Sequence, residues 1–200
     1  MDLEDIFSLD SSNGWDPETY QYFNQLLNHR TVIFNTEISD NIVERVYLPL
    51  KDFEEDDSDE EITLILNSMG GSVSDGFFLA YYIANYKKPL KIIVAGCAAS
   101  MAAIILCGGG NNPNVTRICF PSSYVLFHDG YVTLATSEAK TANDFLAFND
   151  RVDQQIRQFV LEHSKITAEQ YDAQTRHQWF ITAKEMKEFN LIDKIVGCDE

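Results

Sequence analysis

The sequence predicts an α/β protein in which helices cover a parallel β-sheet. Two short apolar runs, at residues 62–66 and 90–95, have the length and continuous hydrophobicity of buried strands. A glycine-containing turn and a helical pattern follow each run, with apolar residues at 77–83 and at 101–107. Because strand–helix–strand units join parallel strands by right-handed crossovers, this order predicts a layered fold.

The other elements follow from local signals. Segment 1–18 is acidic and turn-rich, and we expect it to be mobile or to order only against a partner. Ser39 and Asp40 cap a helix that Pro49 should end or kink, because proline lacks the N–H that a helix interior needs. Thr167 caps another helix. The remaining predicted elements are a short helix from Pro17 to Leu27, strands at 31–34, 116–120 and 124–127, a loop at 108–114, an extended stretch at 178–180, a helix at 182–190 and a strand at 191–196.

We expect a single domain at residues 19–200, after the acidic arm, because 200 residues suffice for one core. The acidic run at 52–61 is typical of a solvated loop, since like charges repel one another. Binding of a divalent ion is the alternative, although the run lacks the glycine of a calcium loop.

The composition excludes several classes of partner. The net charge is −16, which argues against nucleic acids and anionic membranes. No stretch of about 18 apolar residues is present to span a membrane. The acidic N-terminus lacks the basic start of a signal peptide, so we expect a cytoplasmic protein.

Cysteines and histidines give no sign of a metal site or cofactor. The four cysteines show no CxxC spacing, and three lie in apolar runs, which indicates reduced core residues. The four histidines have no ligand-like spacing to one another or to cysteine.

The longest helical signal covers residues 137–163, about 40 Å of helix at ~1.5 Å per residue. Such a helix is longer than a domain of this size needs, so its apolar stripe indicates packing against another subunit. Packing within the chain's own core is the alternative, and the sequence leaves both open. The stripe consists of Ala142, Phe145, Val152, Ile156, Phe159 and Val160.

Ser100 is the strongest candidate for a catalytic residue. Segment 96–103 predicts the end of a buried strand, a tight turn at Gly96 and a helix that begins at Ser100. A serine in this place has its hydroxyl at the mouth of the strand, beside the first free amides of the helix. A nucleophile that generates an oxyanion needs such donors. The alternative is that Ser100 only caps the helix.

Two further elements end strands of the same sheet. The pair Gly70–Gly71 indicates a backbone that Cβ would forbid or that another group approaches closely. His128 is the only histidine at the end of a buried strand, so it is the preferred base for the weakly nucleophilic Ser100 hydroxyl. The alternatives are an ordinary turn glycine and a turn histidine bound to backbone.

With these motifs, residues 20–197 resemble the proteolytic subunit of the Clp protease, the ClpP family of serine peptidases. The order and rough spacing of the motifs agree along about nine-tenths of the chain. The serine and histidine motifs together are far more specific than either glycine pair. The matching segments are 26–30, 67–73, 96–103, 125–128, the long helix, 180–185 and 191–193.

The resemblance implies a crotonase-like fold, a repeated β-β-α spiral with a protruding handle helix at about 137–163. It implies that Ser100 is the nucleophile and His128 the general base, with the amides of Gly71 and Met101 as oxyanion hole. It further implies substrate added as a strand beside the glycine pair, and a chamber of one or two seven-membered rings. An ATPase of the Clp type normally feeds such a chamber.

The chain departs from the family at the acid of the triad. Aligning Thr182 and Ala183 with the family's Ser-Ala places Gln178 where aspartate belongs. An amide oxygen still accepts the Nδ1 proton of His128, but it cannot offset the charge of the imidazolium. Asp172 and Asp129 are alternative acids.

Four other features of the chain differ from the pattern of the family. Met69 replaces the family's proline before the glycines, which should loosen that turn. The 108–114 loop is about three residues longer, and the N-terminal arm is acidic. Thr63 and Ile65 stand where the family tends to place aromatic residues that dock the ATPase, which argues against coupling to the usual unfoldase.

The resulting hypothesis is a homo-oligomeric ClpP-like serine endopeptidase that cleaves unfolded polypeptides or short peptides with a weakened triad. A weakly active or inactive paralogue that assembles with, or regulates, an active subunit is the first alternative. A crotonase-type acyl-thioester enzyme, with the Gly71 and Met101 amides binding an enolate, is the second. Ser100 and His128 argue against the latter, because that chemistry usually recruits carboxylates.

Overall fold

The computed structural model describes residues 26–128 and 139–198. The acidic arm at 1–18, and most of the helix predicted from Pro17, lie outside the described residues, as does Asp129. Within the described residues, no helix is long and apolar enough to cross a membrane.

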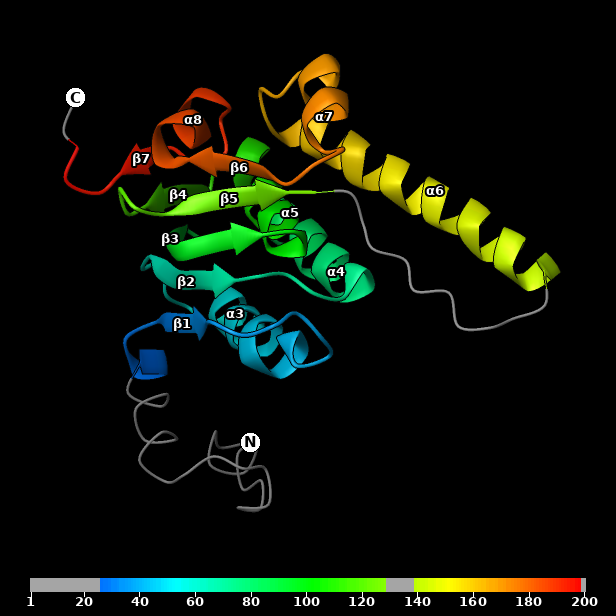
Figure 1. Ribbon diagram of the computed structural model, residues 1–200. Helices are drawn as coiled ribbons and strands as arrows, with labels where there is room; N and C mark the ends of the chain where they lie inside the picture. Colours follow the sequence, from blue (N-terminus) through cyan, green and yellow to red (C-terminus); the bar gives the residue numbers. More distant parts are fainter. Residues whose placement is uncertain (1–25, 129–138, 199–200) are drawn as a thin grey trace.

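The centre of the molecule is a mostly parallel sheet, as the sequence predicts (Figure 1). Its main path runs β1-β2-β3-β4-β7, with parallel pairing at every step. β5 is parallel to β3 and antiparallel to β6. The strands are β1 Thr31–Phe34, β2 Ile62–Ser68, β3 Leu90–Ala99, β4 Val115–Cys119, β5 Tyr124–Phe127, β6 Trp179–Thr182 and β7 Lys194–Ile195.

The predicted turn at Gly96 is wrong, because β3 continues through this residue to Ala99. Gly96 has φ +121°, and the pairing of β2 with β3 shifts register here. Residues 90–94 of β3 pair with β4, whereas 97–99 pair with β5, so Gly96 marks a fork in the sheet. Two side chains outside β3 hold this bulge, since the Gly96 N–H donates to Ser123 Oγ at 3.2 Å and the Cys97 N–H donates to Asn67 Oδ1 at 3.1 Å.

The faces of the sheet differ. Along β1, β2 and β4 the fully buried residues alternate with half-exposed ones, which is the pattern of a sheet covered by helices on one side. Thr63 and Ile65 lie on the more exposed side.

The helical elements are η2 Val43–Tyr47, α3 Leu48–Glu55, α4 Val73–Ala84, α5 Met101–Gly108, η3 Gly109–Asn111, α6 Ala139–His163, α7 Ala168–Gln174 and α8 Ala183–Glu188.

Helix α5 forms the centre of the core, because all eight of its residues are buried. Gly76 on α4 lies so close to α5 that an added Cβ would come within 2.8 Å of Met101 Cβ. Near the end of α6, Phe159 and Val160 are also buried and belong to the same apolar cluster. Helix α4 therefore packs directly against Met101, the first residue of α5 after its N-cap Ser100.

Pro49 does not end its helix. It lies in the first turn of α3, and the chain enters α3 directly from the π-helical turn η2. Proline has no N–H to donate to the carbonyl of Arg45, and an N-terminal position of α3 tolerates this loss. The change from π- to α-helical turns falls between Tyr47 and Leu48, just before Pro49.

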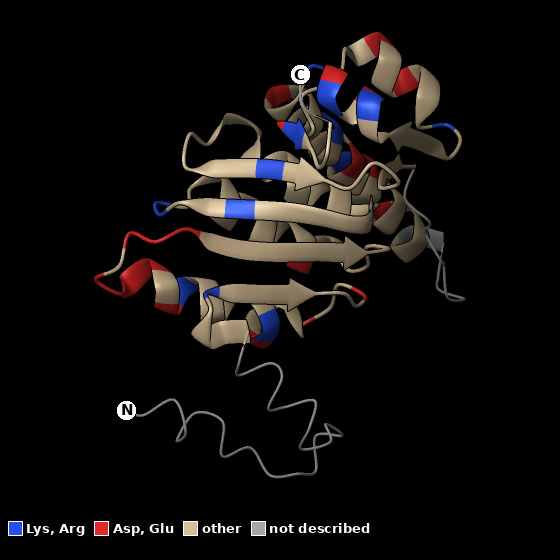
Figure 2. Cartoon of the chain, turned by 90° about the vertical axis from the view of Figure 1, so that its left-hand side faces the viewer, with Lys and Arg blue, Asp and Glu red and all other residues tan. Residues whose placement is uncertain are grey.

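The acidic run is not a free loop. Residues 52–55 belong to α3, and the carboxylates of the run pair with Lys51 of α3 and with three basic side chains from other segments. Figure 2 shows acidic residues gathered where the chain leads from α3 into β2. The ion pairs are Arg30–Asp56, Lys51–Glu54, Lys51–Glu55, Lys88–Asp59 and Lys91–Glu61.

Two further segments differ from the prediction: the predicted loop at 108–114 is partly helical, and the predicted strand at 191–196 is shorter. The predicted loop at 108–114 begins with the end of α5 and the turn η3, and Asn112 is buried with its amide bound to the carbonyls of Ile83 and Tyr86. The terminal strand is reduced to β7, while Leu191 and Ile192 are buried outside it.

Helix α6 matches the predicted handle and leaves the body of the protein at its N-terminal half (Figure 1). Its 25 residues span ~37 Å. Phe145 and Leu146 are each 43% exposed and Phe148 is 57% exposed, whereas Phe159 and Val160 are buried. The C-terminal half therefore packs in the chain's own core, whereas the N-terminal half presents apolar side chains outward. Packing of that half against another subunit stays a prediction.

Candidate active site

Ser100 lies at a sharp turn between β3 and α5. Its φ of +52° is uncommon for a residue other than glycine. Two hydrogen bonds hold this backbone: the Ser100 N–H donates to the Leu126 carbonyl at 2.8 Å, and the Ser100 carbonyl accepts from the Ala103 N–H at 2.9 Å. Strained backbone of this kind persists only where its surroundings impose it, and it is frequent at active sites.

The hydroxyl of Ser100 does not cap the helix. Ser100 occupies the N-cap position of α5, but its side chain makes no cap hydrogen bond. The interpretation of Ser100 as only a helix cap is therefore wrong, because the positive φ turns the side chain away from the cap geometry, which uses β-region backbone. Ser100 is half-buried and stays available for other chemistry.

The Gly70–Gly71 turn lies against Ser100. Both glycines have positive φ, +96° and +146°. A Cβ on Gly70 would fall 2.7 Å from Ser100 Cβ and 3.0 Å from the Met101 nitrogen. On its other side, Gly71 forms an isolated parallel bridge with Ile38. Both glycines are therefore required by close approach as well as by backbone conformation.

The bridge determines where the Gly71 amide points. The Ile38 N–H donates to the Gly70 carbonyl, and the Ser72 N–H donates to the Ile38 carbonyl, each at 2.8 Å. Because the two polar groups of a trans peptide point in opposite directions, the Gly71 N–H faces away from Ile38. Within the described residues, neither this amide nor that of Met101 has a hydrogen-bond acceptor. Two free donors thus lie beside the Ser100 turn.

His128 leaves a strand next to the one that carries Ser100. β5 pairs with the end of β3 in parallel, with Ala99 opposite Leu126, and His128 follows two residues later. Its side chain is half-buried. The Ser100 hydroxyl has no hydrogen bond to a described residue, so a serine–histidine hydrogen bond is not closed in this state. Such bonds are often long without substrate and tighten when it binds.

The β5–β6 ladder ends one residue before His128 and one residue after Gln178. The last antiparallel pair is Phe127–Trp179, and the same register, if extended by one step, would align His128 with Gln178. Directly opposite residues of an antiparallel pair have Cβ atoms ~4.5–5.5 Å apart on one face of the sheet. Gln178 is exposed, and its amide has no hydrogen bond within the described part of the chain.

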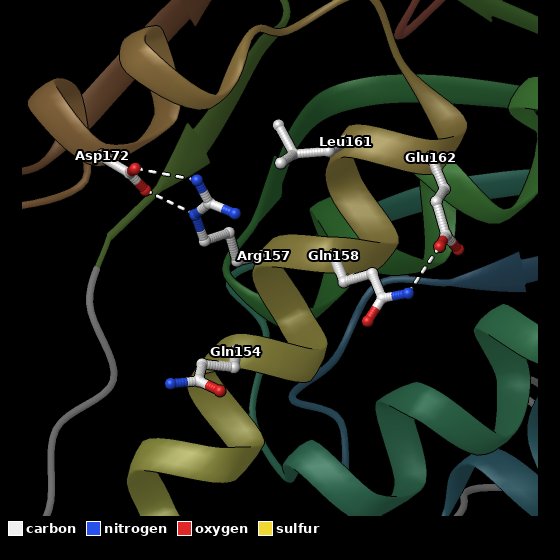
Figure 3. Close-up of a pocket in the computed structure, with 6 residues that line it drawn as sticks. All are labelled: Gln154, Arg157, Gln158, Leu161, Glu162 and Asp172. Atoms are coloured by element: carbon white, nitrogen blue, oxygen red, sulfur yellow. Dashed lines mark hydrogen bonds and ion pairs between the residues drawn. The ribbon is translucent and has the colours of Figure 1, made fainter.

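Asp172 is bound elsewhere (Figure 3). Its two carboxylate oxygens accept from Arg157 Nε at 2.6 Å and Nη2 at 2.8 Å, which joins α7 to α6. The hydrogen bonds from Arg157 hold the pKa of Asp172 below its ordinary value. A groove of about 580 Å³ surrounds this pair and is lined by Gln154, Arg157, Gln158, Leu161, Glu162 and Asp172. Asp172 is thus engaged as an ion-pair partner of the handle.

A second depression, of about 430 Å³, lies at the carboxyl ends of β1 and β2. Met69, 63% exposed, lies at this depression with Glu37, Asn67 and Cys97. It includes both glycines of the turn, so it adjoins the predicted oxyanion hole from the side of β1.

Three of the four cysteines are core residues, and Cys198 is exposed. All four are free thiols, and Cys97, Cys107 and Cys119 are buried. Burial raises the pKa of Cys107 to about 12 and that of Cys119 to about 11, so neither forms a thiolate near neutral pH. Within the described residues, no group of three or more His, Cys, Asp or Glu side chains is arranged to hold a metal ion.

Sequence reasoning missed Ser68 and the segment that follows β1. Ser68 is buried and hydrogen-bonds to Thr36 and to Gly70, and Ile38 forms the bridge to Gly71. A serine two residues before a glycine pair is a weak signal by itself. The contact with residues 36–38 lies about 30 positions away in the sequence, where local patterns carry no information.

Comparison with known families identifies one matching family. A family model described as Clp protease matches residues 14–199, which is nearly the whole chain and includes every element of the site.

Proposed function

Because the chain belongs to the Clp protease family, we propose that it is a serine peptidase in which Ser100 attacks the scissile carbonyl. The attack forms a bond from Ser100 Oγ to the carbonyl carbon, and His128 takes the hydroxyl proton. The same proton then passes to the leaving amine as the peptide C–N bond breaks. Water hydrolyses the acyl-serine by the reverse use of His128.

One observation carries the proposal: the close approach of Gly70 to both Ser100 and the Met101 nitrogen. This contact brings the free amides of Gly71 and Met101 beside the nucleophile. Two amides on one side of the serine are the arrangement that stabilises the oxyanion of acyl transfer. Removing one such donor typically costs ~10²–10³ in rate.

The residue at the predicted acid position of the triad, Gln178, favours low activity in the proposed enzyme. Gln178 has no charge to stabilise the imidazolium that forms during attack, and in a serine protease the loss of the carboxylate costs ~10⁴ in kcat. Asp172 is an unsuitable substitute because Arg157 already holds both of its oxygens. The second candidate is a weakly active or inactive paralogue that assembles with, or regulates, an active subunit. It gains support from the exposed amide of Gln178, which has no hydrogen bond among the described residues.

The proposed substrates are unfolded polypeptides or short peptides, cleaved in an oligomeric chamber. The exposed apolar half of α6 supports self-association, either in one ring of seven or in two. Thr63 and Ile65 offer no aromatic side chains for an ATPase, so the proposal includes no unfoldase of the usual kind.

A fluorophosphonate probe tests the nucleophile directly. We expect the assembled protein to be labelled at Ser100, as shown by mass spectrometry of the modified peptide, and the Ser100→Ala variant to be unlabelled. Ser164 serves as an internal control, because its hydroxyl donates to the Val160 carbonyl and lies outside the site. No labelling of the assembled wild type would refute a poised nucleophile.

A further inference from the structure

Ser68, the last residue of β2, places its hydroxyl between the glycine turn and the segment after β1. The residue is only 3% exposed. Its Oγ donates to the Thr36 carbonyl at 2.6 Å and accepts from the Gly70 N–H at 3.2 Å. The bond to Gly70 is buried and the bond to Thr36 is part-buried, so the hydroxyl joins the glycine turn to the segment after β1 and makes at least one bond that water does not replace easily.

Together with Ile38, Ser68 holds two consecutive peptide units. The Ser68 hydroxyl binds the N–H of the Met69–Gly70 peptide, and the Ile38 N–H binds the carbonyl of the Gly70–Gly71 peptide. The second of these peptides carries the Gly71 amide. The orientation of the Gly70–Gly71 peptide depends on the torsions at Gly70. Fixing the Met69–Gly70 peptide therefore restricts the directions in which the Gly71 N–H can point.

The turn at residues 69–71 needs these hydrogen bonds because its own residues place few restraints on their backbone torsions. Glycine populates both signs of φ, so a Gly-Gly pair has many accessible conformations. Met69 does not lock its own φ, as a proline in its place would. Its side chain is 63% exposed and contributes little packing. Hydrogen bonds from neighbouring segments are therefore the main restraint on the turn.

We infer that Ser68 is a positioning residue for the oxyanion hole: its hydroxyl, through the Gly70 peptide, orients the Gly71 amide toward the substrate carbonyl at Ser100. This inference rests on the proposed serine peptidase chemistry. It assigns to Ser68 no contact with substrate. The effect of Ser68 is on the transition state, because the Gly71 amide binds the charge that develops there.

A matched control exists in Ser123, which is also 3% exposed. Its Oγ donates to the Val94 carbonyl at 2.8 Å and accepts from the Gly96 N–H at 3.2 Å, the same pattern at the bulge of β3. Ser68→Ala and Ser123→Ala thus remove equivalent buried hydroxyls. We expect both variants to lower the melting temperature to a similar degree. A difference in kcat between them then reflects the place of the lost hydroxyl in the fold and not a general loss of stability.

The kinetic test measures cleavage of a fluorogenic peptide by the assembled protein. We expect Ser68→Ala to lower kcat by about 10- to 100-fold with KM within about twofold, since the lost interaction belongs to the transition state. Ser123→Ala should retain kcat within about twofold. Adding Met69→Pro to Ser68→Ala should recover part of the loss, because the ring restrains the turn independently. If Ser68→Ala does not assemble, Ser68→Cys keeps the volume with a weaker acceptor and takes its place.

The outcomes separate this inference from the proposed function. Equal kcat for the two alanine variants, with an active wild type, overturns the role of Ser68 and leaves the peptidase intact. An inactive wild type overturns the peptidase, and hydrogen–deuterium exchange of segment 68–72 then decides the role of Ser68. Faster exchange in Ser68→Ala than in wild type and Ser123→Ala supports the inference, and unchanged exchange overturns it.

Discussion

Gly70 lies directly against Ser100, although the two residues are 30 positions apart in the sequence. A Cβ at Gly70 would fall 2.7 Å from the Ser100 Cβ, closer than real side chains approach. The same Cβ would come within 2.7 Å of the Ala99 carbonyl oxygen. The end of β2 and the start of α5 therefore form one site, and its dimensions allow only glycine at position 70.

Gly70→Ala should lower peptide cleavage and fluorophosphonate labelling by about 10² or more, because moving reacting groups by ~1 Å costs that much. The control is Gly197→Ala. Gly197 also has positive φ, +72°, but nothing lies within 4 Å of its Cβ position. Gly197→Ala therefore introduces backbone strain without a clash at Ser100, so it shows how much of the effect of Gly70→Ala comes from strain alone. A Gly70→Ala variant with the wild-type rate would contradict the close approach.

Gln178→Asp should raise kcat tenfold or more. The register of β5 and β6, extended by one step, would bring position 178 opposite His128, where a carboxylate would stabilise the imidazolium and orient the ring. Gln178→Asn is the matched variant, since it has the size of aspartate without the charge and should give no increase. Peptide cleavage measured between pH 6 and 9 provides the readout. A flat response with the fold preserved would mean that another acid already serves.

Phe148→Asp should shift the protein to smaller species in sedimentation velocity. Phe148 is 57% exposed, so a charge there leaves the protomer core intact while disrupting an apolar contact between copies. Asn143→Asp adds the same charge to the same helix, ~140° around its axis, and should leave the assembly unchanged. A wild type that sediments as a stable monomer at micromolar concentration would refute the proposed oligomer.

Asp56→Asn should destabilise the protomer more than Arg30→Met does. The Arg30 side chain is 12% exposed and lies over the Phe53 ring at 4.8 Å, while Asp56 is 35% exposed. Within the described residues, Arg30 Nε and Nη2 already lack partners. Removing Asp56 leaves the buried cation alone, at a cost of about 1–3 kcal/mol, whereas removing Arg30 leaves a carboxylate that water reaches. Urea unfolding at pH 7 compares the two variants, and equal midpoints would contradict the asymmetry.

The same pair gives a pH dependence. The hydrogen bond from Arg30 lowers the pKa of Asp56 from its usual 3.8. A depressed carboxyl pKa contributes stability that is fully present above the unfolded value and is lost as the pH falls through the folded value. The difference in unfolding midpoint between wild type and Asp56→Asn should therefore be constant from pH 5 to 7 and shrink below about pH 4. A difference that persists undiminished at pH 2 would argue against the ion pair.

Much of the fold could be predicted from local patterns. The buried strands, the start of α5 at Ser100 and the capping box of Thr167 and Gln170 follow from hydrophobic runs and cap residues, and the structure contains them. Errors arose where distant segments decide the outcome. Gly96 forms a bulge because Asn67 and Ser123 bind the backbone there, and the carboxylates after α3 are ordered by Arg30, Lys88 and Lys91.

By itself, the sequence determined which chemistry is available: a serine at a strand–helix turn, a histidine after a buried strand, and glycines where a side chain would clash. Short-range periodicity and residue type carry that information. Only the tertiary structure decided that Ser68 binds Thr36 and Gly70, that Ile38 binds the Gly70 carbonyl, and that Asp172 pairs with Arg157. Such contacts depend on strand register and on segments tens of residues apart, and no local pattern encodes either.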